Sequence, residues 1–143
     1  MEMFDNFKRF EFFSQGPKGK IRKVVKFQQF DSENIYNLAF GDLDEISGII
    51  DFDSRSNNSD RDKVMATVAA TVYEFMAVYS NAVVFVEGGT DAKTRLYQMG
   101  ISKHLSEINL RYVIRGWNGN RWEPFEKGKN YESFSLGRGR FLI

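Results

Sequence analysis

The 143-residue chain contains no cysteine and only one histidine, His104. Without cysteine it cannot form disulfides, thiolate metal sites or a cysteine nucleophile, and one histidine cannot build a histidine-rich metal site. No Ser or Cys lies near His104 in a recognisable catalytic motif, so we interpret it as a structural histidine. The sequence therefore predicts no catalytic residue, no metal ligand and no cofactor, and favours a protein that is not an enzyme.

Targeting and membrane signals are also missing from the sequence. Residues 1–10, MEMFDNFKRF, lack the basic-then-apolar layout of a signal peptide. No apolar run approaches the roughly 18 to 20 residues that cross a bilayer. We expect a soluble, cytoplasmic protein with no membrane partner.

Charge is nearly balanced overall, at +1, but it is divided along the chain. Residues 1–30 hold seven Lys/Arg against three Asp/Glu, and residues 103–143 hold eight against four, so each end carries +4. Residues 31–62 hold two against nine, which gives −7. Such a layout either places a basic face opposite an acidic one or is neutralised within the fold, and the second is the simpler interpretation.

The length and the 14 phenylalanines indicate one packed domain over residues 1–143, with 137–143 as a loose basic tail. Alternating apolar residues predict a first hairpin at 10–14 and 21–27 and a second at 35–40 and 46–52. The elements expected after this meander are a broadly apolar helix 60–79, a buried strand 83–86, a helix from Thr90 or Asp91 to Met99 with Gly100 as its left-handed cap, a short helical piece 102–108, a hairpin 110–117 and 121–125, and an edge strand 131–136. The fold class is therefore α+β, with one mixed sheet.

Four segments resemble a family of small uncharacterised proteins, a domain of unknown function found mainly in Bacteroidetes. The segments are EFFSQGPKGKIRKVVKFQ, YNLAFGD, SNNSDRDKVMATVAATVYEF and EGGTDAKTRLYQMGI. The resemblance covers most of the chain. It implies no activity and assigns no functional residue.

The element order is also similar to that of ribonuclease H-like folds, whose carboxylates bind divalent metal for phosphodiester cleavage. The nearest candidates here are Glu11, Glu74 and Glu87. Glu74 comes late in its helix, which makes this metal-dependent nuclease an unfavoured alternative, and element order does not imply function.

Acidic side chains also cluster between residues 42 and 53, at Asp42, Asp44, Glu45, Asp51 and Asp53. Their spacing does not match an EF-hand loop, so solvated turn carboxylates are the simpler interpretation.

One stretch has the layout of an anion site, where strand 83–86 ends and the next helix begins. Glycines at such a turn let a ligand approach main-chain N–H groups, and basic side chains would add to the positive end of the helix dipole. The candidate residues are Gly88, Gly89, Thr90, Lys93 and Arg95. The expected ligand is a phosphate or a partner's carboxylate. A purely structural turn, with Arg95 paired to Glu87 or Asp53, is the competing interpretation.

Single-stranded nucleic-acid binding is the main alternative, because cations and stacking rings occur together on predicted strands. The candidates are Lys18, Lys20, Arg22, Lys23, Lys26, Arg111, Arg115, Trp117, Arg121 and Trp122. A third hypothesis is an interaction module that assembles with itself or with an unidentified protein through helix 60–79. The sequence names no specific partner.

Overall fold

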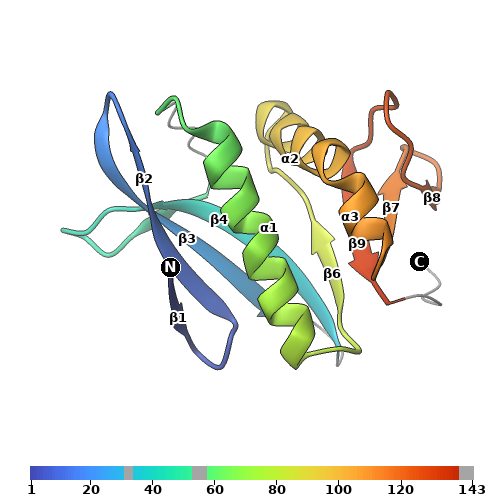
Figure 1. Ribbon diagram of the computed structural model, residues 1–143, viewed down its shortest axis with the longest axis horizontal. Coiled ribbons are helices and arrows are strands. Elements are labelled where there is room, and N and C mark those ends of the chain that lie inside the picture. Colours follow the sequence, from blue (N-terminus) through green and yellow to red (C-terminus); the bar gives the residue numbers. More distant parts are fainter. Residues whose placement is uncertain (31–33, 53–57, 139–143) are drawn as a thin grey trace.

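The computed structural model describes residues 1–30, 34–52 and 58–138. Figure 1 shows its elements, which form a mixed α+β fold. In chain order they are β1 (Glu2–Phe4), β2 (Arg9–Gly16), β3 (Gly19–Gln29), β4 (Ile35–Leu43), β5 (Ile50–Asp51), α1 (Arg61–Val78), β6 (Val83–Val86), α2 (Asp91–Lys103), α3 (Leu105–Asn109), β7 (Val113–Trp117), β8 (Trp122–Pro124) and β9 (Ser133–Gly137). Within these ranges the strands form one sheet in the order β1-β2-β3-β4-β6-β9-β7-β8, and β5 pairs with β4.

The predicted N-terminal meander is confirmed by β2, β3 and β4, which pair antiparallel in chain order. The prediction missed β1, a three-residue edge strand beside β2. It also made the return strand of the second hairpin too long, because only Ile50 and Asp51 pair with β4. The Asp44 carboxylate explains the difference. It accepts hydrogen bonds from the amides of Ile46 and Ser47, which commits that segment to a turn.

The second half of the sheet begins with β6, which lies parallel to β4 after the α1 crossover. The interpretation of residues 131–136 as an edge strand is wrong. β9 lies inside the sheet and pairs with β6 on one side and β7 on the other. Its Phe134 is fully buried, which stabilises a central position through the apolar area removed from water.

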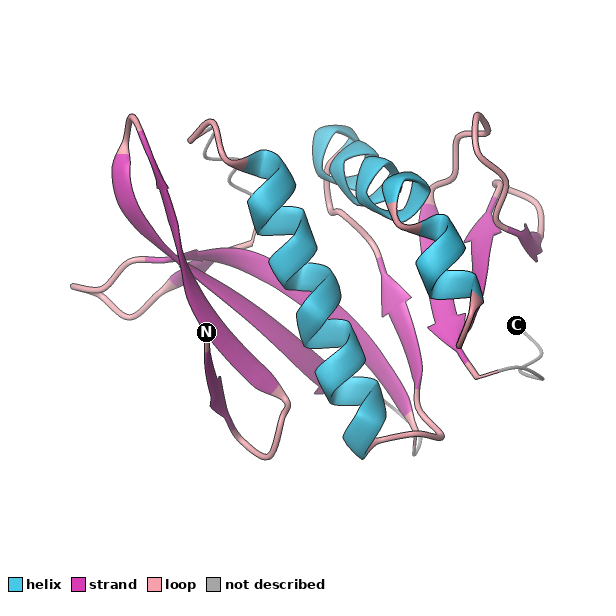
Figure 2. Cartoon of the chain, viewed as in Figure 1, coloured by secondary structure: helices cyan, strands magenta, loops and turns pink. Residues whose placement is uncertain are grey.

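The helices of the described residues, α1, α2 and α3, all cover one face of the sheet (Figure 2). Phe75 of α1 stacks on Phe27 of β3, with ring centres 4.2 Å apart, and meets Tyr36 of β4 edge-on at 4.8 Å. Because side chains alternate along a strand, the remaining positions point to the opposite face, which no helix of the described chain covers. We call this second surface the open face.

Two features of the helices differ from expectation. In the broadly apolar helix α1 the polar Thr71 is fully buried, and its hydroxyl donates to the carbonyl of Val68 at 2.7 Å. Gly100 does not end α2, which continues to Lys103. A Cβ on Gly100 would lie 3.0 Å from the side chain of Met65, so this glycine allows α2 to pass close to α1.

Asp60 occupies the N-cap position of α1, but its side chain makes no capping hydrogen bond to the helix. Its carboxylate instead accepts hydrogen bonds from the Ser14 hydroxyl at 2.8 Å and the Gln15 amide at 2.9 Å. The end of the first hairpin is thereby fixed to the start of α1. Among the helices of the described ranges, none combines the length and apolar character that crossing a membrane requires.

Candidate functional site

The turn between β6 and α2 is built by its own side chains. The Thr90 hydroxyl caps α2 by accepting from the amide of Lys93 at 3.2 Å. The amide of Gly88 donates to the Thr94 hydroxyl at 3.2 Å, and a Cβ on Gly88 would lie only 2.2 Å from the Thr94 nitrogen. Gly89 has a φ of 75°, which favours glycine. Both glycines therefore have structural reasons to be there.

Lys93 lies on the inner side of α2. Its side chain is buried, and its ammonium donates to the carbonyls of Phe40 and Phe52, the latter at 2.6 Å. The ammonium also lies 5.0 Å from the centre of the Phe40 ring. Lys93 thus connects α2 to β4 and to the residue after β5, and it does not line the pocket at the helix start.

That pocket has a volume of about 310 Å³ and lies between the start of α2 and residues 130–132. We call it the α2 pocket. Its lining residues are Glu87, Gly89, Thr90, Asp91, Thr94, Arg95, Gln98, Asn130, Tyr131 and Glu132. Three are carboxylates and only Arg95 is a cation, so the lining carries a net negative charge. Sequence spacing did not indicate Glu132, because a β-hairpin and a loop separate it from α2.

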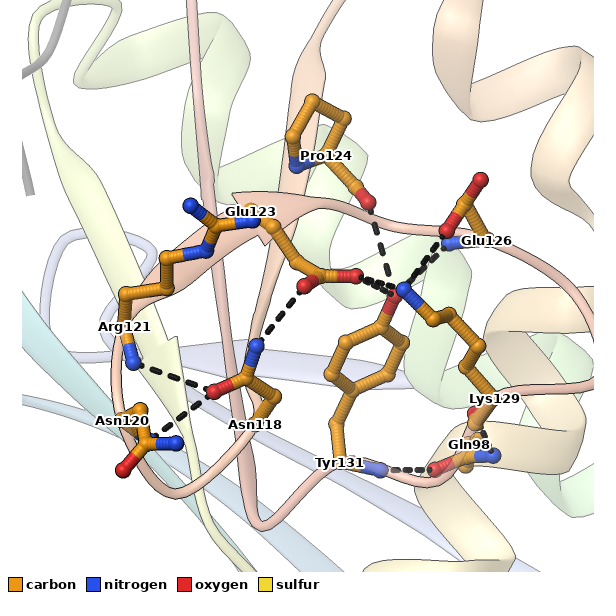
Figure 3. A network of polar contacts seen from close by, with 9 residues as sticks. All are labelled: Gln98, Asn118, Asn120, Arg121, Glu123, Pro124, Glu126, Lys129 and Tyr131. Carbon is orange, nitrogen blue, oxygen red and sulfur yellow. Dashed lines mark hydrogen bonds and ion pairs between the residues drawn. The ribbon is translucent and has the colours of Figure 1, made fainter.

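A hydrogen-bond network holds one wall of the α2 pocket (Figure 3). The side-chain carbonyl of Gln98 accepts from the amide of Tyr131 at 2.9 Å, and its amide group donates to the carbonyl of Lys129 at 2.6 Å. The Tyr131 hydroxyl donates to Glu123 at 2.9 Å. Residues 129–131 are therefore fixed against α2.

Glu123 is the centre of this network. Its carboxylate accepts from Lys129 and from Asn118, each at 2.7 Å, in addition to Tyr131. These hydrogen bonds, that of Lys129 first, lower the pKa of Glu123 to about 2. Burial and the bond to Glu123 raise the pKa of Tyr131.

The predicted basic residues do not form one surface. Lys23 is buried on the helix-covered side and donates to Asp42 at 2.5 Å. Arg22 bonds to Glu11 at 2.6 Å, and its pKa is raised chiefly by this hydrogen bond. The ammonium of Lys20 lies 4.7 Å from the centre of the Phe13 ring near the end of the first hairpin. Of the others, Lys18 and Arg111 are exposed in turns.

The remaining predicted residues do come together on the open face. Strand alternation and register place Lys26, Arg115, Trp117 and Trp122 there, with Arg121 exposed next to Trp122. Two further aromatic residues, Phe30 and Phe85, join them and were missed. Phe85 belongs to the apolar run 83–86, which the sequence predicted to be a buried strand. In the structure its side chain is half-buried.

The three carboxylates of the nuclease alternative do not converge. Glu11 is on the open face, where it accepts from Arg9 and Arg22. Glu74 is exposed on α1, on the other side of the sheet. The described residues contain no group of three or more His, Cys, Asp or Glu side chains placed to hold a metal ion. In the acidic segment 42–53, Asp42 pairs with Lys23, and Asp53 lies outside the described residues.

Comparison with known protein families identifies the family of this chain. The chain belongs to a family of unknown function, DUF6934, whose model matches residues 1–139. This confirms the resemblance to an uncharacterised family, and its taxonomic range stays a prediction. No curated protein and no solved structure matches the chain.

Proposed function

We propose that this protein is a non-catalytic binding module and that its ligand occupies the α2 pocket. The observation that carries the proposal is the set of charges around this space. In the part of the chain that the structure describes, no ion pair or hydrogen bond engages the side chains of Glu87, Asp91, Arg95 and Glu132, although all four line one hollow. The less exposed charged side chains Glu11, Lys23 and Glu123, by contrast, are paired within the protein.

The size of the α2 pocket suits a small molecule or the end of a peptide. Its volume of about 310 Å³ is at the lower end of the range of roughly 300 to 1,000 Å³ for ligand sites. Thr94 and Asn130 add hydrogen-bonding groups to the lining. The wall formed by Gln98 and Tyr131 is fixed before any ligand arrives, which reduces the entropy cost of binding.

The charges that line the α2 pocket favour a different ligand from the phosphate or carboxylate that the sequence alone indicated. A phosphate at Arg95 would also meet Glu87, Asp91 and Glu132, and like charges repel it. Because the ammonium of Lys93 is buried under α2, it does not offset them. We therefore propose a zwitterionic ligand, with an ammonium or guanidinium facing the carboxylates and a carboxylate facing Arg95.

Chemical-shift mapping tests this function. Free lysine, free arginine, diglycine and inorganic phosphate would be titrated separately into labelled protein at constant ionic strength. We expect lysine or arginine to shift the amide signals of Gly89, Thr90 and Arg95, and phosphate to leave them unchanged. Glu132→Gln and Arg95→Gln should each weaken binding, whereas Glu74→Gln, which removes an exposed charge from α1, should not.

The outcomes separate the competing interpretations. Shifts with phosphate alone would restore the simple anion site and overturn the zwitterion. No shift with any of the four probes would leave the β6–α2 turn as a purely structural feature and would contradict the proposed function.

A further inference from the structure

A continuous row of aromatic rings crosses part of the open face. Phe30, which follows β3, lies 6.2 Å from Phe85 of β6, measured between ring centres. Phe85 lies 5.6 Å from Trp122 of β8, and Trp122 lies 5.6 Å from Trp117 of β7. We call these four residues the aromatic row. They come from three separate parts of the chain, since Trp117 and Trp122 face each other in one hairpin, and the folded sheet brings the three parts together.

The rings of the aromatic row are accessible. Phe30 is 49% exposed, and Phe85, Trp117 and Trp122 are half-buried. The Phe residues of the core differ sharply from them, since Phe10, Phe75 and Phe134 are at most 1% exposed. A surface of four adjoining, partly exposed rings is uncommon, because burial of an aromatic side chain removes a large apolar area from water.

Cations and neutral polar groups surround these rings. The register places Asn37, Ser135 and Arg115 in one line across the sheet with Phe85, and Gln28 lies beside Asn37. No carboxylate occurs in this line. Neither Lys26 nor Arg115 has an ion-pair partner in the ranges that the structure describes. The surface therefore combines stacking planes, hydrogen-bonding spacers and unneutralised positive charge.

We propose that the open face binds single-stranded nucleic acid, with bases stacked on the aromatic row and phosphates contacting Arg115, Lys26 and Arg121. Every base has a π face, so stacking tolerates any sequence, and the cations supply the electrostatic attraction to the backbone. A duplex is a poor occupant because its bases are already stacked and paired. An apolar protein partner fits less well, since the half-buried Arg115 and Asn37 would be buried with it.

This inference is independent of the α2 pocket, because no residue of the aromatic row lines that pocket. Failure of one proposal leaves the other intact. It also differs from the basic surface indicated by the sequence. Lys23 is buried and Arg22 is bound by Glu11, so the nucleic acid would run from the end of β3, at Lys26 and Phe30, across β6 to β7 and β8, away from the turn of the first hairpin.

The two tryptophans of the chain provide a direct readout, because both belong to the aromatic row. Titration with oligothymidylate of about eight nucleotides at low salt should quench their fluorescence, since stacked bases alter the indole environment. Polyphosphate of matched charge should bind more weakly and cause little quenching. A duplex of the same length should also quench little.

Paired variants separate stacking from general electrostatics. Phe85→Leu should weaken binding about tenfold or more, whereas Phe4→Leu, on an exposed ring of the edge strand β1, should not. Arg115→Gln should lower the slope of log affinity against log salt by about 1. Lys63→Gln, which removes the same charge from the helix-covered side, should leave that slope unchanged. Thermal melting of each variant confirms that it is folded.

Three results would overturn the proposal. The first is no quenching by oligothymidylate at high protein concentration. The second is equal binding of polyphosphate, which would make the contact purely electrostatic. The third is a tryptophan spectrum that changes on dilution without nucleic acid, which would show that a second copy of the protein covers the aromatic row.

Discussion

The ammonium of Lys93 donates a hydrogen bond to the carbonyl of Phe52 over 2.6 Å, although the two residues are 41 positions apart. A second bond reaches the carbonyl of Phe40. The side chain therefore satisfies main-chain acceptors of two segments below α2. Its role differs from that of Arg95, two positions away, which is exposed at the α2 pocket.

We expect the two basic residues to respond differently to substitution. Lys93→Met keeps the apolar stem but removes the donors, which leaves buried carbonyls without their partner and should lower the free energy of unfolding by about 1–3 kcal/mol. Arg95→Gln changes an exposed side chain and should alter it by less than about 0.5 kcal/mol. Urea denaturation of the two variants measures both values, and equal losses would contradict the structural role of Lys93.

The carboxylate of Glu123 should make the protein sensitive to acid. Its pKa is about 2 in the folded state against an ordinary value of 4.5, so the unfolded state binds the proton more tightly. The stabilisation is fully present above pH 4.5 and is lost as the pH falls toward 2. We expect thermal stability to decrease over this interval, and the decrease to be smaller in Glu123→Gln.

Glu74→Gln provides the matched control, because Glu74 is an exposed carboxylate on α1. It should keep the full acid-dependent decrease of the original protein. The pKa of Glu11 is also lowered, since the hydrogen bonds from Arg22 and Arg9 outweigh the opposing effect of its burial. Some acid dependence should therefore remain in Glu123→Gln. Identical pH profiles for all three proteins would show that the Glu123 network does not stabilise the fold.

Local patterns were sufficient to predict most elements. The alternation of apolar residues identified β3 and β4, and the hairpin predicted at 110–117 and 121–125 corresponds to β7 and β8. The sequence did not indicate which strands pair when they lie far apart in the chain. Residues 131–136 were assigned to an edge because nothing local indicates that β9 inserts between β6 and β7, which depends on the whole sheet. The end of α2 was misplaced for a similar reason, since Gly100 packs on Met65 of another helix.

The candidate sites were predictable to a smaller extent. Spacing located the start of α2, but a charged residue in a first turn can point inward or outward, and Lys93 points inward. Glu132 reaches the α2 pocket from a distant loop. On the open face the tryptophans were predicted, whereas Phe85 was not, because an apolar run of four residues does not reveal which side chain lacks a cover.

The packing of α1 on the sheet gives the last prediction, which compares two valines of one helix. Val68 is 4% exposed within the core, whereas Val78 is 48% exposed at the end of α1. Val68→Asp would bury a carboxylate among apolar side chains, and we expect it to unfold the protein or to destabilise it by more than about 3 kcal/mol. Val78→Asp makes the same chemical change at an exposed position. Its carboxylate would lie near the negative end of the helix dipole, which should lower the free energy of unfolding by at most about 1 kcal/mol. Thermal melting followed by circular dichroism distinguishes the two, and a Val68→Asp protein as stable as Val78→Asp would contradict the position of α1 over the sheet.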